Sequence, residues 1–202
     1  MKNKKRAIIF GVTGQDGSYL SSFLIKKNYK VYGVYRRTST KSFTRLNNHI
    51  NHKNFELIVG DVSDPVSVLE ILSETKPEEI YNLAAQSHVG VSFKVPQSTL
   101  MINSFGALNI LESIRNLELI KKTKFYQAGT SEMFGGASRK AYNEMSKFAP
   151  KSPYGASKVM AHHLTVNYRE AYNIFATNGI LFNHESPLRG DNFVTKKIIY
   201  NL

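Results

Sequence analysis

Tyr154 and Lys158 form a candidate acid–base pair. They are four positions apart, so a helix that begins at Pro153 would place both side chains on one face, one turn from each other. A lysine ammonium that close to a phenol favours the phenolate, and we expect it to lower the pKa of Tyr154 from its ordinary value of about 10 toward neutrality. Such a tyrosine could take a proton from a sugar or alcohol hydroxyl. Taken alone, the spacing is more often that of an aromatic residue and a solvated lysine on an amphipathic helix.

The composition is that of a globular chain with a basic surface. The sequence has 202 residues, of which 42% are hydrophobic, and this is enough for one sizeable core. It has no cysteine, which excludes disulfides and thiolate metal sites, and we expect no metal site. The formal net charge is +12, but the lysines are scattered and there is no arginine-rich tract. A basic surface of this kind favours phosphate-bearing small ligands over nucleic acid.

Neither end of the chain has the pattern of a signal peptide or a membrane span. The apolar run Ala7–Phe10 is short and leads directly into a glycine-rich turn, so it predicts a buried strand. No stretch approaches the roughly 18 apolar residues of a spanning helix. We therefore expect a cytoplasmic protein with no membrane contact.

A glycine-rich turn between a strand and a helix predicts a phosphate site. The strand is expected over Arg6–Val12 and the helix over Ser18–Ile25, and the turn between them reads Gly11-Val12-Thr13-Gly14-Gln15-Asp16-Gly17. Small residues at this spacing let the backbone approach a pyrophosphate, which sits at the positive end of the helix. A tight turn without a ligand is the alternative.

The residues after the second and third predicted strands bear on the choice of cofactor. Arg36 and Arg37 follow the strand Lys30–Tyr35, where an NAD site usually has an acidic residue, so they favour the 2′-phosphate of NADP. An exposed basic pair is the alternative. Asp61 follows the strand Phe55–Val59 and could either accept a hydrogen bond from adenine or cap a turn.

Small and polar residues follow the fourth and fifth predicted strands. The strand Glu79–Leu83 ends in Ala84-Ala85-Gln86-Ser87-His88, where small residues leave room for a flat cofactor. His88 is a candidate acid–base group, although a structural histidine is the favoured interpretation. The strand Lys124–Ala128 runs into Thr130-Ser131-Glu132, a polar cluster that is costly to bury without a purpose. Glu132 could act there as a base, or the cluster could be a capped turn.

Strands and helices alternate along the chain. We expect helices from Pro65 with Asp64 as N-cap, over Pro96–Leu117, and from Pro153 to about Tyr172. A sixth strand is expected over Phe175–Phe182, and the polar segment Thr38–Lys53 is expected to be a loop with a short helix or a contact surface. The alternation predicts an α/β fold with a doubly wound parallel sheet, covered by helices on both faces.

Several separate stretches together resemble the extended short-chain dehydrogenase/reductase superfamily. They are Gly11–Gly17, Leu83–Ser87, Thr130–Glu132, Tyr154 with Lys158, and Asn183–Gly190. Within that superfamily the chain is similar to the GDP-mannose 4,6-dehydratase family. The phrases that carry this similarity are Gly-Val-Thr-Gly-Gln-Asp-Gly-Ser-Tyr-Leu, Asn-Leu-Ala-Ala-Gln-Ser-His-Val, Thr-Ser-Glu-Met-Phe-Gly and Asn-His-Glu-Ser-Pro. The resemblance implies a Rossmann domain over residues 1–182 and the beginning of a substrate-binding region over 183–202.

The resemblance also implies sites for NADP and for GDP-mannose. The implied cofactor-binding residues are Gly11, Val12, Thr13, Gly14, Gln15, Asp16, Gly17, Arg36, Asp61, Val62, Leu83, Ala84, Ala85, Gln86, Ser87, Ser98, Tyr154, Lys158, His184 and Arg189. The implied catalytic residues are Thr130, Glu132, Tyr154 and Lys158, and the implied substrate-binding residues are Ser87, Thr130, Glu132 and Asn183.

The chemistry implied by the family suits these residue types. Tyr154 as phenolate would take the proton of the sugar 4-hydroxyl while a hydride passes from C4 to NADP⁺, and Thr130 would stabilise the 4-oxygen. The 4-ketone acidifies the proton on C5, which Glu132 would remove while the C6 hydroxyl leaves as water. The hydride then returns to C6, so NADP⁺ is regenerated. The product would be GDP-4-dehydro-6-deoxy-mannose.

The chain departs from the family pattern in two ways. Leu188 stands where the family usually has the first of two arginines after Ser-Pro, although Arg189 remains. Family members are also longer, so we expect a truncated chain that lacks much of the sugar-nucleotide pocket. Family members are dimers or tetramers, and we expect a homo-oligomer at full length. Alternatives are a dehydratase or epimerase for another nucleotide sugar, or a cofactor-binding fragment without turnover.

Overall fold

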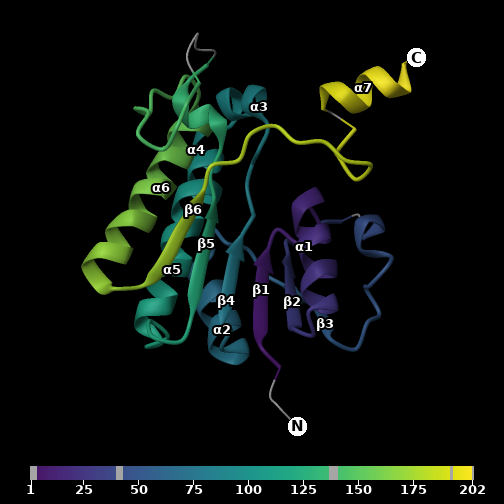
Figure 1. Cartoon of the computed structure of the whole chain (residues 1–202), viewed down its shortest axis with the longest axis vertical. Coiled ribbons are helices and arrows are strands. Elements are labelled where there is room, and N and C mark those ends of the chain that lie inside the picture. The colour runs from purple at the N-terminus through teal and green to yellow at the C-terminus, as the bar shows by residue number, and fades with distance from the viewer. Residues whose placement is uncertain (1–3, 40–42, 137–140, 192, 202) are drawn as a thin grey trace.

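Six parallel strands form one sheet in a computed structural model that describes residues 4–39, 43–136, 141–191 and 193–201. The strands are β1 (Arg6–Phe10), β2 (Lys30–Tyr35), β3 (Phe55–Val59), β4 (Glu79–Asn82), β5 (Lys124–Ala128) and β6 (Phe175–Gly179). Their order is β3-β2-β1-β4-β5-β6, so the chain winds outward from β1 in both directions. The predicted doubly wound parallel sheet is confirmed (Figure 1).

Helices lie on both faces of this sheet (Figure 1). The α-helices are α1 (Gln15–Lys26), α2 (Pro65–Thr75), α3 (Val89–Lys94), α4 (Pro96–Leu100), α5 (Gly106–Asn116), α6 (Pro153–Tyr172) and α7 (Val194–Tyr200). Shorter turns are the 3-10 helices η1 (Thr44–Leu46) and η3 (Ser131–Phe134), and the π-helix η2 (Met101–Phe105) between α4 and α5. Within the described ranges, no helix is both long and apolar enough to cross a membrane.

Alternate residues of the strands supply two cores, one on each face of the sheet. In β1, Ile8 and Phe10 face one side while Ala7 and Ile9 face the other, and all four are fully buried. Ile8 and Phe10 pack with residues of α2 and α5, and Ala7 and Ile9 pack with Leu24 of α1. A central parallel strand is covered on both faces, which explains why β1 is apolar throughout.

Three predicted strands are shorter in the structure. Those expected over Arg6–Val12, Glu79–Leu83 and Phe175–Phe182 end at Phe10, Asn82 and Gly179. In each case apolar residues continue past the last paired residue into the segment that leaves the carboxyl edge of the sheet. The hydrophobic pattern therefore marks the strand but not where its pairing ends.

Two helices also differ from the expectation. The helix expected over Ser18–Ile25 begins at Gln15, inside the glycine-rich turn. The helix expected over Pro96–Leu117 is helical to Asn116, but its middle turn is the π-helix η2. Segment 38–53 contains the short helix η1, as expected, and residues 40–42 within it lie outside the described residues.

Replacing Asp64 by alanine should destabilise the fold by about 1 kcal/mol. The Asp64 carboxylate accepts hydrogen bonds from the backbone N–H groups of Val66 at 3.0 Å and Ser67 at 3.3 Å, as expected of the N-cap of α2. Alanine would leave both donors without this partner. The measurement is urea unfolding followed by circular dichroism, with Asp64→Asn as the control because asparagine keeps the acceptor. An equal loss in both variants would show that the charge, and not the cap, stabilises the helix.

Candidate active site

A cleft of about 610 Å³ opens along the carboxyl edge of the sheet. Its lining comes from the glycine-rich turn after β1, the chain after β4, η3 after β5 and the first turns of α6. Most of the remaining wall is the crossing segment, which we define as residues 180–191, and Arg45, Phe193 and Val194 complete it. The crossing segment leaves β6 and passes over the carboxyl edge toward α1 (Figure 1). Open α/β sheets bind their ligands at this edge.

The glycine-rich turn brings the start of α1 directly to the end of β1. Gly11 has a φ of 81°, a conformation that favours glycine. A Cβ on Gly17 would lie 2.5 Å from the carbonyl oxygen of Gly11 and 2.6 Å from Cα of Val12, so a side chain there would collide. Gly14 precedes α1, and no side chain caps the first turn of the helix. Residues of that turn line the cleft, and the start of a helix with no side-chain cap favours an anion.

Helix α6 begins at the cleft because Ser152 caps it. The Ser152 hydroxyl accepts a hydrogen bond from the Gly155 N–H at 3.0 Å. A Cβ on Gly155 would lie 2.7 Å from the carbonyl oxygen of Glu132, so the helix packs directly on η3. As a result, the first turns of α6 bring both Tyr154 and Lys158 to the lining of the cleft.

The ionisation of Tyr154 differs from the expectation. Tyr154 is only 8% exposed, and burial raises the pKa of its phenol above the ordinary value. The hydrogen bond with Thr130 lowers the pKa, the charge of Glu132 raises it, and the charge of Arg189 lowers it. The predicted lowering of this pKa by Lys158 is wrong, because desolvation dominates and outweighs both the Thr130 hydrogen bond and the charge of Arg189.

Lys158 directs its ammonium to the backbone rather than to the phenol. Its Nζ donates to the carbonyl oxygen of Ala128, at the end of β5, at 2.9 Å. Lys158 is 3% exposed, and burial lowers its pKa to about 8. The ammonium form still predominates at pH 7, but Lys158 loses its proton at a pH roughly two units lower than a solvated lysine does.

Thr130 and Glu132 are held together by a helix cap. The Thr130 hydroxyl accepts a hydrogen bond from the Glu132 N–H at 3.3 Å and caps η3. The capped turn that sequence left as one alternative is therefore present. The same turn also supplies both residues to the cleft lining, beside Tyr154.

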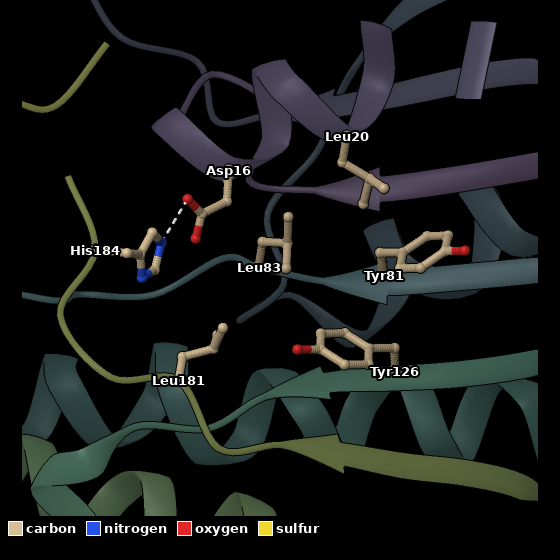
Figure 2. A pocket seen from close by; sticks show the side chains of 7 residues that line it. All are labelled: Asp16, Leu20, Tyr81, Leu83, Tyr126, Leu181 and His184. Carbon is tan, nitrogen blue, oxygen red and sulfur yellow. Dashed lines mark hydrogen bonds and ion pairs between the residues drawn. The ribbon is translucent and has the colours of Figure 1, made fainter. Parts of the chain in front are cut away.

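The crossing segment is bonded to the glycine-rich turn through His184 and Ser186. His184 Nε2 lies 2.8 Å from a carboxylate oxygen of Asp16 (Figure 2), and Ser186 donates to the side-chain oxygen of Gln15 at 2.8 Å. The other ring nitrogen of His184 lies 2.8 Å from the carbonyl oxygen of Phe182. Both ring nitrogens thus face acceptors. The Phe182 carbonyl and then the Asp16 carboxylate raise the pKa of His184 above its ordinary value.

Two arginines line the cleft beside this attachment. Arg189 lies 3.6 Å from the Glu185 carboxylate. Arg45 donates to the carbonyl oxygens of Leu188 at 2.8 Å and Thr13 at 3.3 Å, so it ties the crossing segment to the glycine-rich turn. Sequence reasoning missed Arg45, because it lies in a polar segment with no motif or periodicity to mark it.

Most of the predicted site residues meet in this one cleft. Those that line it are Gly11, Gly14, Gln15, Asp16, Gly17, Leu83, Ala85, Ser87, Thr130, Glu132, Tyr154, Lys158, Asn183, His184 and Arg189.

The other predicted cofactor residues lie outside the cleft lining, and most have other structural roles. Val12 is fully buried in the core, and Val62 is buried while its carbonyl oxygen accepts from the Asn109 side chain at 2.8 Å. Asp61 accepts from the Ser63 N–H at 2.9 Å, which is the turn-capping alternative.

Five further residues complete this group. The carbonyl oxygen of Thr13 accepts from Arg45 at 3.3 Å. Arg36 and Ser98 are exposed, Arg36 after β2 and Ser98 on α4. The backbone of Ala84 packs against Gly11. The fifth residue, Gln86, is hydrogen-bonded through its backbone to a side chain of η2.

The side chain of Asn103, on η2, connects the chain after β4 to α6. Its side chain accepts from the Gln86 N–H at 2.9 Å and donates to the Gln86 carbonyl oxygen at 3.1 Å and to the Ser157 hydroxyl at 2.9 Å. Isolated π-helical turns such as η2 are frequent at functional sites.

His88 caps a helix, because its Nδ1 accepts a hydrogen bond from the Val91 N–H of α3 at 3.3 Å. His88 also lines the cleft, so its structural interpretation stays a prediction.

A second pocket of about 300 Å³ adjoins the cleft behind the Asp16–His184 pair (Figure 2). Its remaining lining residues are Leu20, Tyr81, Leu83, Tyr126 and Leu181. This pocket is largely apolar, whereas the cleft is also lined by Glu132, Tyr154 and Lys158. The cleft is therefore the candidate active site.

The chain matches one family over almost its whole length. The model of the family described as GDP-mannose 4,6 dehydratase matches residues 8–202. The GDP-mannose 4,6-dehydratase of Vibrio cholerae serotype O1 is 51% identical over 97% of this chain and 54% of its own length. The GDP-mannose 4,6 dehydratases of Arabidopsis thaliana and Homo sapiens are 50% and 48% identical, over 98% of this chain and 57% and 55% of their own lengths. The chain thus spans about half the length of the curated relatives it matches.

Solved structures show the same fold at lower sequence identity. The dTDP-glucose 4,6-dehydratase of Bacillus anthracis, in complex with NAD, has a TM-score of 0.83 at 19% identity and covers 98% of this chain and 61% of its own. The dTDP-glucose 4,6-dehydratase of Streptomyces venezuelae has a TM-score of 0.85 at 20% identity, over 97% of this chain and 61% of its own.

The Asp16–His184 pair should make the attachment of the crossing segment depend on pH. The folded pKa of His184 is raised, so its stabilising charge is fully present below the ordinary value of about 6.5 and is lost as the pH rises through the folded value. An NMR titration should therefore give His184 a pKa above that of a solvated histidine, and Asp16→Asn should lower it. His162 on α6 is the internal control, because its pKa is lowered by burial. An unchanged His184 pKa in Asp16→Asn would mean that the pair does not form in solution.

Proposed function

The chain belongs to the GDP-mannose 4,6-dehydratase family, and we propose that the protein removes water from GDP-mannose to give GDP-4-dehydro-6-deoxy-mannose, with NADP as cofactor. One observation carries the proposal: Thr130, Glu132, Tyr154 and Lys158 meet in a cleft that also contains an anion-binding helix start. The chain spans about half the length of its relatives, so the proposal rests on the cofactor and proton-transfer groups and leaves sugar-nucleotide recognition to measurement.

The residues present suit a dinucleotide cofactor. The space where Gly17 would carry a Cβ is taken by the backbone of Gly11 and Val12, so the turn presents backbone rather than side chains to a pyrophosphate. When bound, NADP supplies the oxidation at C4 of the sugar and the later reduction at C6. Lys158 and His184 line the same cleft and would contact the ribose and nicotinamide end.

Tyr154 is the proposed acceptor of the proton from the sugar 4-hydroxyl. Burial raises its pKa, so the phenol is protonated near neutral pH in this structure. The hydrogen bond with Thr130 and the charge of Arg189 act in the opposite direction. Further positive charge brought beside the phenol by a ligand would complete the lowering of this pKa that a base requires. Thr130 would then hydrogen-bond the developing 4-oxygen.

Glu132 is the proposed base for the second proton transfer. Its place in the cap of η3 keeps it in the cleft, close enough to Tyr154 for its charge to act on the phenol. Glu132 would take the C5 proton next to the new ketone and pass it to the departing C6 hydroxyl, which leaves as water. Tyr154 would return its proton to C5 when C6 is reduced, so one carboxylate and one phenol account for all the protons and both end as they began.

The proposed reaction predicts loss of one water from GDP-mannose and from no other nucleotide sugar in a panel. The assay incubates the protein with NADP⁺ and each sugar, and scores the mass change of 18 Da that one water represents, in parallel with NADP⁺ binding. Glu132→Gln should reduce water loss by about 100-fold or more, because the amide cannot accept the C5 proton. The Glu132→Gln variant should still oxidise C4 of the sugar, so the reduced cofactor should accumulate and be detected by its absorbance.

Each outcome of this assay has a distinct meaning. NADP⁺ binding without water loss from any sugar would support the alternative that this chain binds the cofactor but does not turn over a substrate. Water loss from another nucleotide sugar would overturn the substrate. Unchanged dehydration in Glu132→Gln would remove Glu132 from the mechanism.

Replacing Arg36 by alanine should weaken NADP⁺ by about tenfold or more and leave NAD⁺ almost unchanged, because hydrogen bonds to a charged phosphate are worth roughly 1.5–3 kcal/mol. Arg36 is exposed immediately after β2, where the 2′-position of a bound adenosine is read in this fold. The measurement is isothermal titration of both cofactors, and Arg37→Ala is the matched control. Equal weakening of NADP⁺ and NAD⁺ by Arg36→Ala would contradict this role.

A further inference from the structure

Three amide side chains stand in register across β4, β5 and β6. Asn82 pairs in register with Gln127, and Gln127 pairs with Asn178. They lie two residues beyond apolar core positions such as Ile80 and Phe125, so they face the same side of the sheet. Asn82 is fully buried and Gln127 is 1% exposed. The core on this face therefore ends in a row of amides directly beneath the cleft.

The two inner amides lead to the carbonyl group that holds Lys158. Asn82 donates to the side-chain oxygen of Gln127 at 2.8 Å. Gln127 in turn donates through Nε2 to the carbonyl oxygen of Ala128 at 3.1 Å, and Lys158 Nζ donates to the same oxygen at 2.9 Å. Nε2 and Nζ therefore lie no more than about 6 Å apart.

Packing alone does not explain these amides. A buried amide is unfavourable unless its polar atoms are paired, and the side-chain oxygen of Asn82 has no hydrogen-bond partner among the residues described. Leucine and methionine have nearly the sizes of asparagine and glutamine and would fill the space without that penalty. They could not supply an N–H group directed at the Ala128 carbonyl.

We propose that Gln127, held in place by Asn82, is a positioning residue for Lys158. By donating to the same oxygen, Gln127 fixes the carbonyl and limits how strongly the ammonium can bind it. One of the three N–H donors of Lys158 is then anchored, and the other two are left for a ligand in the cleft. The inference deepens the proposed function, since it concerns a lysine that contacts the cofactor there.

Other charged and titratable groups surround Lys158 on the elements packed against α6. Those that share the cleft lining with it include Tyr154 on α6 itself, Glu132 on η3, His88 after β4, and His184 and Arg189 on the crossing segment. Glu112 of α5 pairs with Arg115 at 2.6 Å and meets α6 at Tyr168, ten residues beyond Lys158. Substitutions at Asn82 and Gln127 leave all of these groups in place, so a change in Lys158 can be assigned to the amides.

The test is an NMR titration of Lys158 in protein labelled with ¹³C at lysine Cε, with the resonance assigned by its absence in Lys158→Met. The double variant Asn82→Leu/Gln127→Met removes both amides at nearly constant volume. It should raise the pKa of Lys158 by about 0.5 unit, because the ammonium no longer shares its acceptor. Gln127→Glu differs by one atom and should raise the pKa by at least about 1 unit, because a carboxylate then lies within about 6 Å.

Asn178→Leu is the matched control, since Asn178 donates to the carbonyl oxygen of His162 and not to that of Ala128. It should leave the Lys158 pKa unchanged. The double variant should also weaken NADP⁺ binding severalfold without lowering the thermal midpoint. A Lys158 pKa that moves in neither Gln127 variant would overturn the proposal. The titration needs no cofactor, so failure of the wild-type protein to bind NADP⁺ would count against the proposed function alone.

Discussion

The parallel direction of all six strands is the constraint on which the site depends. Because every strand ends at the same edge, the segments after β1, β4, β5 and β6 meet in one cleft, and Asp16 and His184 touch across a separation of 168 residues. Two close approaches bring the helices to this edge. Gly17 packs on the backbone of Gly11, and Gly155 packs on that of Glu132, each where a side chain would collide. The sheet therefore gathers the groups, and the glycines let α1 and α6 start beside them.

Within the cleft, burial controls the ionisable groups more strongly than neighbouring charge. Desolvation is the first cause of the raised pKa of Tyr154 and of the lowered pKa of Lys158. Both shifts favour the neutral forms. Near neutral pH the pair is thus a neutral phenol beside a lysine that is still mostly charged, and charge from a ligand would have a large effect on both groups.

The sequence predicted the fold and most of the cleft, because burial and strand ends leave local signatures. Apolar runs followed by glycine or polar clusters located all six strands, and the residues after four of them line the cleft. The role of Gln127 depends on the register of β5 against β4, which no local pattern encodes. The same holds for Arg45, whose partners Thr13 and Leu188 lie far away in the chain. Arg45 donates to the backbone carbonyl oxygen of Leu188, so this hydrogen bond does not depend on which side chain stands at position 188. The expected domain boundary at residue 182 stays a prediction.

The attachment of the crossing segment to the glycine-rich turn also closes most of the chain into one loop. The bonds between Gln15 and Asp16 on one side and Ser186 and His184 on the other enclose nearly every element of the sheet. The entropy lost on closing so long a loop grows only slowly with its length. A dinucleotide that binds both sides of this closure would add its binding free energy to the stability of the fold and act as a folding ligand.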